Sequence, residues 1–299
     1  MDRVSSRSER GCGSSRPSPT VPARESRQVP TKTRRNCDAR EGFSAFTLIE
    51  LLIVVAILGV LVALTLPALA KSIESAQAAQ STNNLRQLVT ANVAYAAENG
   101  VYCPASNILL DKLWCGAWSS ADGAFDPTQG YLSDYLGKSR RVMVCPLFKD
   151  MIKGSASFED GTGGYGYNAS HVGGIPAGGY NADDSSVSAR VTAIQRANTV
   201  MFTTAAKANG SGIQEWPFCE PPYWDYGNGP SQTRPPPTVH FRFNNKALVG
   251  WCDGRVTAEA CDPREVGYNP HGGDPKAQKL GWFGPDEENG FWNPKRRGP

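Results

Sequence analysis

The residues of this chain that could do chemistry are chiefly its cysteines and histidines. Eight cysteines are spread over 299 residues, and no two of them have the C-x-x-C spacing of a zinc ribbon or a thioredoxin-like redox site. The three histidines, His171, His240 and His271, leave little room for an imidazole-based metal or catalytic cluster. We therefore expect no enzyme, and disulfide formation is the cysteine chemistry that remains.

Six of the cysteines lie beyond residue 100: Cys103, Cys115, Cys145, Cys219, Cys252 and Cys261. An even number is typical of three disulfides in an oxidising compartment, and the alternative is a set of buried free thiols. A predicted two-residue turn at Asp253-Gly254 would pair Lys246 with Cys261 across a hairpin. Cys252 and Cys261 would then lie roughly 20 Å apart, whereas a disulfide needs Cα atoms within about 7 Å, so this pairing is disfavoured.

Acidic and aromatic residues are weaker candidates for binding. Asp183-Asp184 and Asp286-Glu287-Glu288 offer oxygen ligands of the kind Ca²⁺ prefers, but no EF-hand pattern is present and such runs are usually solvated. We expect no cofactor and no metal site, with Ca²⁺ as the single candidate considered. Six aromatic residues could form a sugar-binding or partner-binding surface, although packing in a domain rich in glycine and proline is the more common role: Trp114, Trp118, Trp216, Trp224, Tyr223 and Tyr226.

The chain that must position these residues begins with a basic segment. Residues 1–45 hold ten Lys and Arg against five Asp and Glu, are rich in Ser and Pro, and lack apolar periodicity. This composition predicts a disordered leader. The whole chain, with 31 basic and 28 acidic residues, is too balanced for a dedicated nucleic-acid binder, and we expect no nucleic-acid partner.

Residues 46–70 form an apolar run in which Glu50 is the single charged residue. As a helix this run reaches roughly 37 Å, enough to cross a hydrocarbon core of about 30 Å. It is longer than the core of a cleaved secretory signal, which is the main alternative. The basic leader predicts that the N-terminus stays in the cytoplasm. Pro67 lies inside the run and would kink or locally loosen the helix.

The helical pattern continues over residues 71–99. Residues spaced for one helix face follow in the order Leu85, Leu88, Val89, Asn92, Tyr95 and Ala96. Gly100 is a natural residue to end the helix. We therefore predict one helix over residues 46–99, with a membrane-spanning half, 46–70, and an amphipathic half, 71–99, that packs on a soluble domain.

Residues 100–299 form the predicted globular domain. Glycine and proline are dense there, and short β-like runs occur at residues 141–145 and 198–204 and around Asp253-Gly254. Turn-rich stretches separate these runs, which favours a small antiparallel sheet with long loops. The expected fold class is α+β, with the long N-terminal helix packed on that sheet.

The head of the apolar run, from Phe46 to Glu50, resembles the N-terminal methylation segment of type IV prepilins and type II secretion pseudopilins. In that family a leader is cleaved before a Phe, and a Glu is the fifth residue of the mature chain. The resemblance implies cleavage between Ala45 and Phe46 and N-methylation of Phe46. The family usually has Gly before the cleaved bond, but cleavage after Gly42 would make Glu50 the eighth residue. Polar side chains here are costly in lipid, and the resemblance assigns Thr47, Glu50 and Pro67 to assembly.

A second resemblance concerns residues 243–254. A subgroup of pseudopilins has a C-terminal box of His, nine residues and Asp-Gly, and here nine residues separate Phe243 from Asp253-Gly254. Because Phe occupies the His position, any role of that His would be absent from this chain.

The family resemblance implies a pilin-like fold and a structural role. The chain would be a subunit of a type II secretion pseudopilus or a type IV pilus-like filament, stored in the inner membrane with its C-terminal domain in the periplasm or on a surface filament. Its partners would be further copies of itself, other pseudopilins, prepilin peptidase and an inner-membrane assembly platform. The alternative is a membrane-anchored extracytoplasmic binding module or enzyme that uses a pilin-like anchor.

Overall fold

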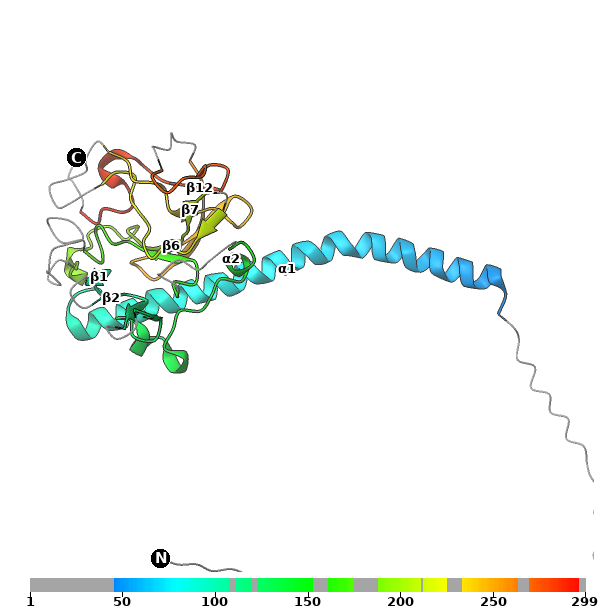
Figure 1. The fold of residues 1–299 in the computed structure, drawn as a ribbon, viewed down its shortest axis with the longest axis horizontal. Coiled ribbons are helices and arrows are strands. Elements are labelled where there is room, and N and C mark those ends of the chain that lie inside the picture. The colour runs from blue at the N-terminus through cyan, green and yellow to red at the C-terminus, as the bar shows by residue number, and fades with distance from the viewer. Residues whose placement is uncertain are drawn as a thin grey trace, which may run out of the picture. The chain divides into compact units, whose positions relative to one another are not determined.

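The computed structural model describes residues 46–295, except residues 108–110, 120–122, 153–160, 175–187, 211, 225–232 and 263–268. Contacts divide the chain into two compact units, Met1–Ala56 and Ile57–Pro299. The described residues form one long helix and several small antiparallel sheets (Figure 1), so the fold is α+β and consistent with a pilin-like protein.

Helix α1 runs over Leu48–Asn99 as a single element of 52 residues, and Pro67 does not end it. Gly100 follows with a φ of 76°, and its N–H donates a hydrogen bond to the Ala96 carbonyl at 2.9 Å. This left-handed residue turns the chain away from the helix axis, as the sequence predicts for Gly100.

One face of the C-terminal half of α1 packs on the domain. Its buried residues are Ser81, Asn84, Leu85, Leu88, Val89, Ala91, Asn92 and Ala96, which confirms most of the predicted stripe. Tyr95 lies at the edge of this face, with its ring edge-on to those of Tyr131 and Tyr135. The Asn92 side-chain oxygen accepts a hydrogen bond from the Cys103 N–H at 2.9 Å, so the polar member of the stripe holds the chain just after it leaves the helix.

A central sheet of four antiparallel strands has the order β11-β10-β6-β5. Its strands are β5 (Tyr165–Tyr167), β6 (Val200–Thr204), β10 (Lys246–Trp251) and β11 (Val256–Ala260). A second sheet has the order β1-β2-β3-β4, with β1 at Ser106–Asn107, β2 at Lys112–Leu113, β3 at Gly116–Trp118 and β4 at Phe125–Asp126. Two strand pairs complete the described sheets: β7 (Lys207–Asn209) with β8 (Gly212–Gln214), and β9 (Val239–His240) with β12 (Leu280–Gly281).

Strand β10 is buried on both faces. Successive side chains of a strand point to opposite sides, so neighbouring residues of β10 enter different core clusters. Leu248 belongs to the same core cluster as Leu85 of α1, whereas Val249 and Trp251 belong to a second cluster. Gly250 faces the helix, and a Cβ built on it would lie 2.6 Å from Cγ2 of Val89. Glycine at this position therefore allows the helix and the sheet to approach closely.

The second cluster is completed by the C-terminal part of the chain, on the side of the central sheet away from α1 (Figure 1). Trp282, Phe283 and Trp292 are all buried there. The Val200 N–H of β6 donates a hydrogen bond to the Phe291 carbonyl at 2.8 Å, which ties this segment to the sheet. The sheet therefore has a helix on one face and an irregular aromatic layer on the other.

The β10–β11 hairpin differs from the predicted register by one residue. Lys246 pairs with Ala260 rather than with Cys261, so the loop holds three residues, Cys252–Gly254, instead of two. Gly254 has a φ of 92°, as required of the last residue in the common three-residue hairpin loop. The Asp-Gly pair marks the turn correctly, but the left-handed glycine closes a longer loop than the two-residue one.

The β-like run at residues 141–145 is not a strand. The Asn84 side-chain nitrogen donates to the carbonyls of Met143 and Val144 at 3.4 and 3.3 Å. The Cys145 N–H donates to the Gly163 carbonyl at 2.9 Å, and the short helix α2 (Pro146–Lys149) begins directly afterwards. A side chain of α1 thus supplies hydrogen bonds that a neighbouring strand would otherwise supply.

Candidate functional site

The head of α1 is a capping box built from Thr47 and Glu50. Glu50 Oε2 accepts hydrogen bonds from the Thr47 backbone N–H and from the Thr47 hydroxyl, both at 2.9 Å. The Glu50 N–H donates in return to Thr47 Oγ1 at 3.3 Å. Two backbone N–H groups that the helix leaves without partners are thereby satisfied reciprocally.

This arrangement gives Thr47 and Glu50 a local role that our sequence analysis missed. In the sequence both side chains stand out as polar groups that are costly in lipid, and the family resemblance assigns them to assembly, although Thr-x-x-Glu before an apolar run is also the sequence signature of a capping box. A carboxylate in the first turn is also favoured by the positive end of the helix dipole. Phe46 precedes the cap and is 79% exposed, and Ala45 lies outside the described residues.

The apolar residues that follow the cap are exposed to an unusual degree. All large hydrophobic side chains from Leu48 to Ile73 are exposed, with Leu48 at 84% and Leu64 at 70%. By length and composition α1 is able to cross a membrane. Exposed apolar surface of this extent needs a lipid or protein environment, which is consistent with a membrane-anchored protein.

The two ends of the predicted C-terminal box lie at opposite ends of β10. Phe243 is buried and, together with Glu74 and Ala78 of α1, lines a small groove. It begins a tight turn to Lys246, in which Asn244 and Asn245 both have positive φ. Asp253 and Gly254 form the turn after β10, where Asp253 Oδ1 accepts from the Arg255 N–H at 3.1 Å.

This spacing therefore corresponds to one strand and its two flanking turns. Between Phe243 and Asp253 the strand alone spans six residues, or roughly 20 Å. The box residues do not converge, and their arrangement here is that of a hairpin frame rather than a binding site.

The six cysteines beyond residue 100 lie in different environments. Cys103, Cys145 and Cys219 are buried free thiols, and Cys252 is a partly buried one. Cys115 is buried, and Cys261 is exposed after β11. Burial raises the pKa of the Cys103 and Cys219 thiols, which keeps them neutral. The buried thiols pack as small apolar side chains, and disulfide formation stays a prediction.

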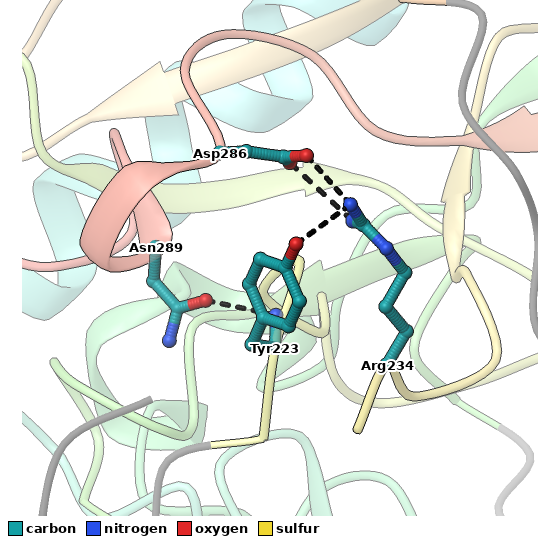
Figure 2. Close-up of polar contacts among 4 residues, drawn as sticks. All are labelled: Tyr223, Arg234, Asp286 and Asn289. Carbon is teal, nitrogen blue, oxygen red and sulfur yellow. Dashed lines mark hydrogen bonds and ion pairs between the residues drawn. The ribbon is translucent and has the colours of Figure 1, made fainter. Parts of the chain in front are cut away.

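The acidic run at residues 286–288 is part of an ion-pair cluster, shown in Figure 2. Arg234 donates to the two carboxylate oxygens of Asp286 at 3.3 and 2.6 Å, and to the Tyr223 hydroxyl at 2.9 Å. Asn289 Oδ1 accepts a hydrogen bond from the Tyr223 N–H at 2.8 Å. The hydrogen bond between Arg234 and the Asp286 carboxylate raises the pKa of Arg234. The cluster ties the C-terminal segment to the chain at Tyr223 and Arg234.

Metal binding finds no support in this run or elsewhere in the described residues. The carboxylate of Asp286 is committed to Arg234, and Asp183-Asp184 lie outside the described residues. Within the part of the chain that the structure describes, no group of three or more His, Cys, Asp or Glu side chains could hold a metal ion.

The six aromatic residues singled out in the sequence separate into different environments. Trp114 is fully buried in the core, and Tyr223 belongs to the ion-pair cluster. Trp118, Trp216 and Trp224 line one cavity, while Tyr226 lies outside the described residues. Glu220 and Lys207 line the same cavity, and no sequence signal pointed to either of them.

Comparison with known proteins identifies one segment of the chain. Residues 42–66 match the family described as the prokaryotic N-terminal methylation motif. Both candidate cleavage sites, after Gly42 and after Ala45, lie inside the matched range. No curated protein and no solved structure matches the chain. The capped apolar helix and this motif together identify the head of the chain as a type IV pilin- or pseudopilin-family segment.

Proposed function

We propose that this protein is a structural subunit of a type II secretion pseudopilus or a type IV pilus-like filament. In this proposal prepilin peptidase cleaves between Ala45 and Phe46, Phe46 is N-methylated, and the mature subunits assemble through α1. The chain acts as a filament component rather than as an enzyme. The observation that carries the proposal is an exposed apolar helix whose capped head lies within the matched methylation motif.

Cleavage would change the charge at the head of the helix. Hydrolysis of the Ala45–Phe46 bond leaves a carboxylate on Ala45 and a new α-ammonium on Phe46, four residues before Glu50. Residues at this spacing share one helix face. Both Thr47 donors bind Oε2 of Glu50, so the second carboxylate oxygen lies outside the capping box. It can receive the ammonium of its own chain or that of a neighbouring subunit, and the latter would set the axial register of assembly.

The same helix accounts for the proposed membrane location and for the proposed partners. Before assembly the exposed residues of α1 are covered by lipid, with the basic leader in the cytoplasm and the domain in the periplasm. In the filament, neighbouring helices replace the lipid, so apolar surface stays out of water in both states. The partners in this scheme are copies of the chain, other pseudopilins, prepilin peptidase and an inner-membrane assembly platform.

The cleavage register is tested by producing the full chain together with a prepilin peptidase and measuring the intact mass. We expect a mature protein that begins at N-methylated Phe46. A mature chain that begins at Phe43 would overturn this register, and retention of residues 1–45 would overturn processing itself.

Assembly is tested by comparing three variants in sheared filament fractions. Glu50→Leu removes a charge whose cost in lipid is on the order of 2.5–3.5 kcal/mol at the bilayer centre and smaller near the interface, so it should insert and be cleaved normally yet be absent from filaments. Thr47→Ala weakens the cap that holds the Glu50 carboxylate but keeps the charge, and should assemble at reduced abundance. Glu74→Leu, at an exposed acid further along α1, is the matched control. Glu50→Leu subunits at wild-type abundance in filaments would contradict the proposal.

The alternative is a membrane-anchored binding module, and the cavity beside Glu220 is the observation that favours it. The two functions differ in oligomeric state. Sheared surface fractions should hold the protein in high-order oligomers if it is a filament subunit, and membranes should hold it as a monomer if it is an anchored module.

A further inference from the structure

A cavity of about 380 Å³ lies in the domain, away from every residue used in the proposed function. Its volume falls in the range of small-molecule sites. Most of its wall is apolar, and the indoles of Trp118, Trp216 and Trp224 contribute to it together with Phe218 and Pro236. The three indole side chains are only partly buried, so part of each is open to an incoming molecule.

One wall of this cavity carries a buried carboxyl group that lacks a partner. Glu220 is 2% exposed, and its Oε1 accepts a long hydrogen bond from Trp216 Nε1 at 3.4 Å. Its Oε2 is buried without any hydrogen-bond partner. Burial raises the pKa of Glu220 to about 7. A buried oxygen left in this state costs free energy, which a hydrogen-bond donor on a bound molecule would recover.

The backbone holds Glu220 rigidly in place. Its N–H donates to Thr238 Oγ1 at 2.9 Å, and its carbonyl accepts from Trp282 Nε1 at 3.3 Å. These two bonds fix the backbone of Glu220, which lines the cavity, so a ligand would not have to order this part of the chain.

The cavity also carries a positive charge, because the Lys207 ammonium lies 4.0 Å from the centroid of the Trp216 ring. The His271 ring lies 6.4 Å from the same centroid, and burial together with Lys207 lowers its pKa, which favours the neutral imidazole. Trp216 thus contacts the carboxyl group through its N–H and the ammonium through its ring face. An anionic ligand would meet Glu220, and a cationic ligand would meet Lys207, so neither sign of net charge suits the cavity.

We propose that this cavity binds a neutral saccharide, with a sugar hydroxyl donating to Glu220 Oε2 and an apolar ring face packed against the indoles. Hydroxyl groups both donate and accept hydrogen bonds, so they can serve the carboxyl group and the ammonium together. The C–H face of a pyranose ring is apolar and weakly positive, and it complements the negative face of an indole. A purely apolar ligand would bury Glu220 Oε2 further and leave it unpaired.

The test is binding of maltose, cellobiose and N-acetylglucosamine to the full chain in a detergent without a sugar headgroup. Saturation-transfer NMR and tryptophan fluorescence report the contact, and toluene and tetramethylammonium, which have no hydroxyl group, serve as the apolar and cationic comparison probes. We expect at least one saccharide to bind and the comparison probes not to bind. Binding of toluene or tetramethylammonium without any saccharide would overturn the proposal, as would the absence of binding by every probe.

Variants then locate the site. At pH 8, where Glu220 is ionised, the nearly isosteric Glu220→Gln should weaken saccharide binding by about tenfold or more, because the charge-assisted hydrogen bond is lost. Trp224→Ala, on a partly buried side chain, should weaken binding severalfold with little effect on folding. Glu287 is exposed and does not line the cavity, so Glu287→Gln should bind like the wild type. Equal saccharide affinity in the wild type, Glu220→Gln and Trp224→Ala would overturn the proposed site.

Discussion

The two ends of α1 differ in both sequence and surroundings. Leu48 and Leu64 are 84% and 70% exposed, whereas Leu85 and Leu88 are at 0% and 1%. The N-terminal end is apolar on all sides, while the C-terminal end carries its apolar residues on one face. The first end therefore suits an apolar solvent that surrounds it, and the second suits a single protein partner.

The largest expected effect is the difference in domain stability between leucine-to-alanine variants at the two ends of α1. Leu85→Ala should lower the free energy of unfolding of the domain by about 2–5 kcal/mol, because it leaves a cavity between α1 and the central sheet. Leu61→Ala, in the 53% exposed position, should leave it within about 0.5 kcal/mol of the wild type. Tryptophan fluorescence during denaturation of the full chain in detergent measures this, since all seven Trp lie after α1. Equal losses in the two variants would contradict the comparison.

The contribution of Glu220, in the domain, to the free energy of unfolding should depend on pH, whereas that of Glu50, at the head of α1, should not. Burial raises the pKa of Glu220 from 4.5 to about 7, so between these values the folded state binds a proton that the unfolded state has released. This proton uptake contributes roughly 3 kcal/mol to the free energy of unfolding. The contribution is fully present below about pH 4.5 and is lost as pH rises through 7.

His240 acts in the opposite direction, because burial lowers its pKa and it stabilises the fold less as pH falls below 6.5. The measurement is therefore the difference between wild type and Glu220→Gln in free energy of unfolding from pH 4.5 to 8. This difference should shift with pH, while the difference between wild type and Glu50→Gln should stay flat. A flat profile for Glu220→Gln would show that its burial does not perturb the carboxyl group.

Gly250 of β10 and Gly59 of α1 differ in the space available for an added methyl group. Gly250→Ala would place a Cβ 2.6 Å from Val89 Cγ2, so we expect a loss of about 1–3 kcal/mol through overpacking. Gly59→Ala meets nothing within 4 Å and should leave domain stability unchanged. Denaturation of both variants under the conditions used for Leu85→Ala checks this, and an unaffected Gly250→Ala variant would mean that α1 does not press on β10.

The smallest expected effect concerns the cap. Thr47→Ala removes the hydroxyl that binds Glu50 and should cost about 1 kcal/mol at the head of the helix, with no change in domain unfolding. Hydrogen exchange of the first helical amides should rise about fivefold, since 1.4 kcal/mol is a factor of ten. Unchanged exchange would mean that the cap is dispensable.

The predicted features that hold in the structure are those set by local pattern. The end of α1 at Gly100, its buried stripe and strand β6 follow from helical periodicity, a left-handed glycine and a β-rich run. Errors arise where a distant segment competes for the same groups. The Asn84 side chain of α1 donates hydrogen bonds to the carbonyls of Met143 and Val144, so the run at residues 141–145 is not a strand. Cysteine number suggests disulfides, but their pairing depends on distances in space that the spacing in sequence does not contain.

The long helix, its division into an apolar half and an amphipathic half, and the methylation segment at its head could be predicted from the sequence, because these depend on contacts within a few residues. The aromatic layer around Trp282 and Trp292, and the cavity that Trp118, Glu220 and His271 line, emerged from the tertiary structure alone. Those features join segments far apart in the chain through long loops. Each is stabilised by packing that no single segment provides, so no local pattern records it.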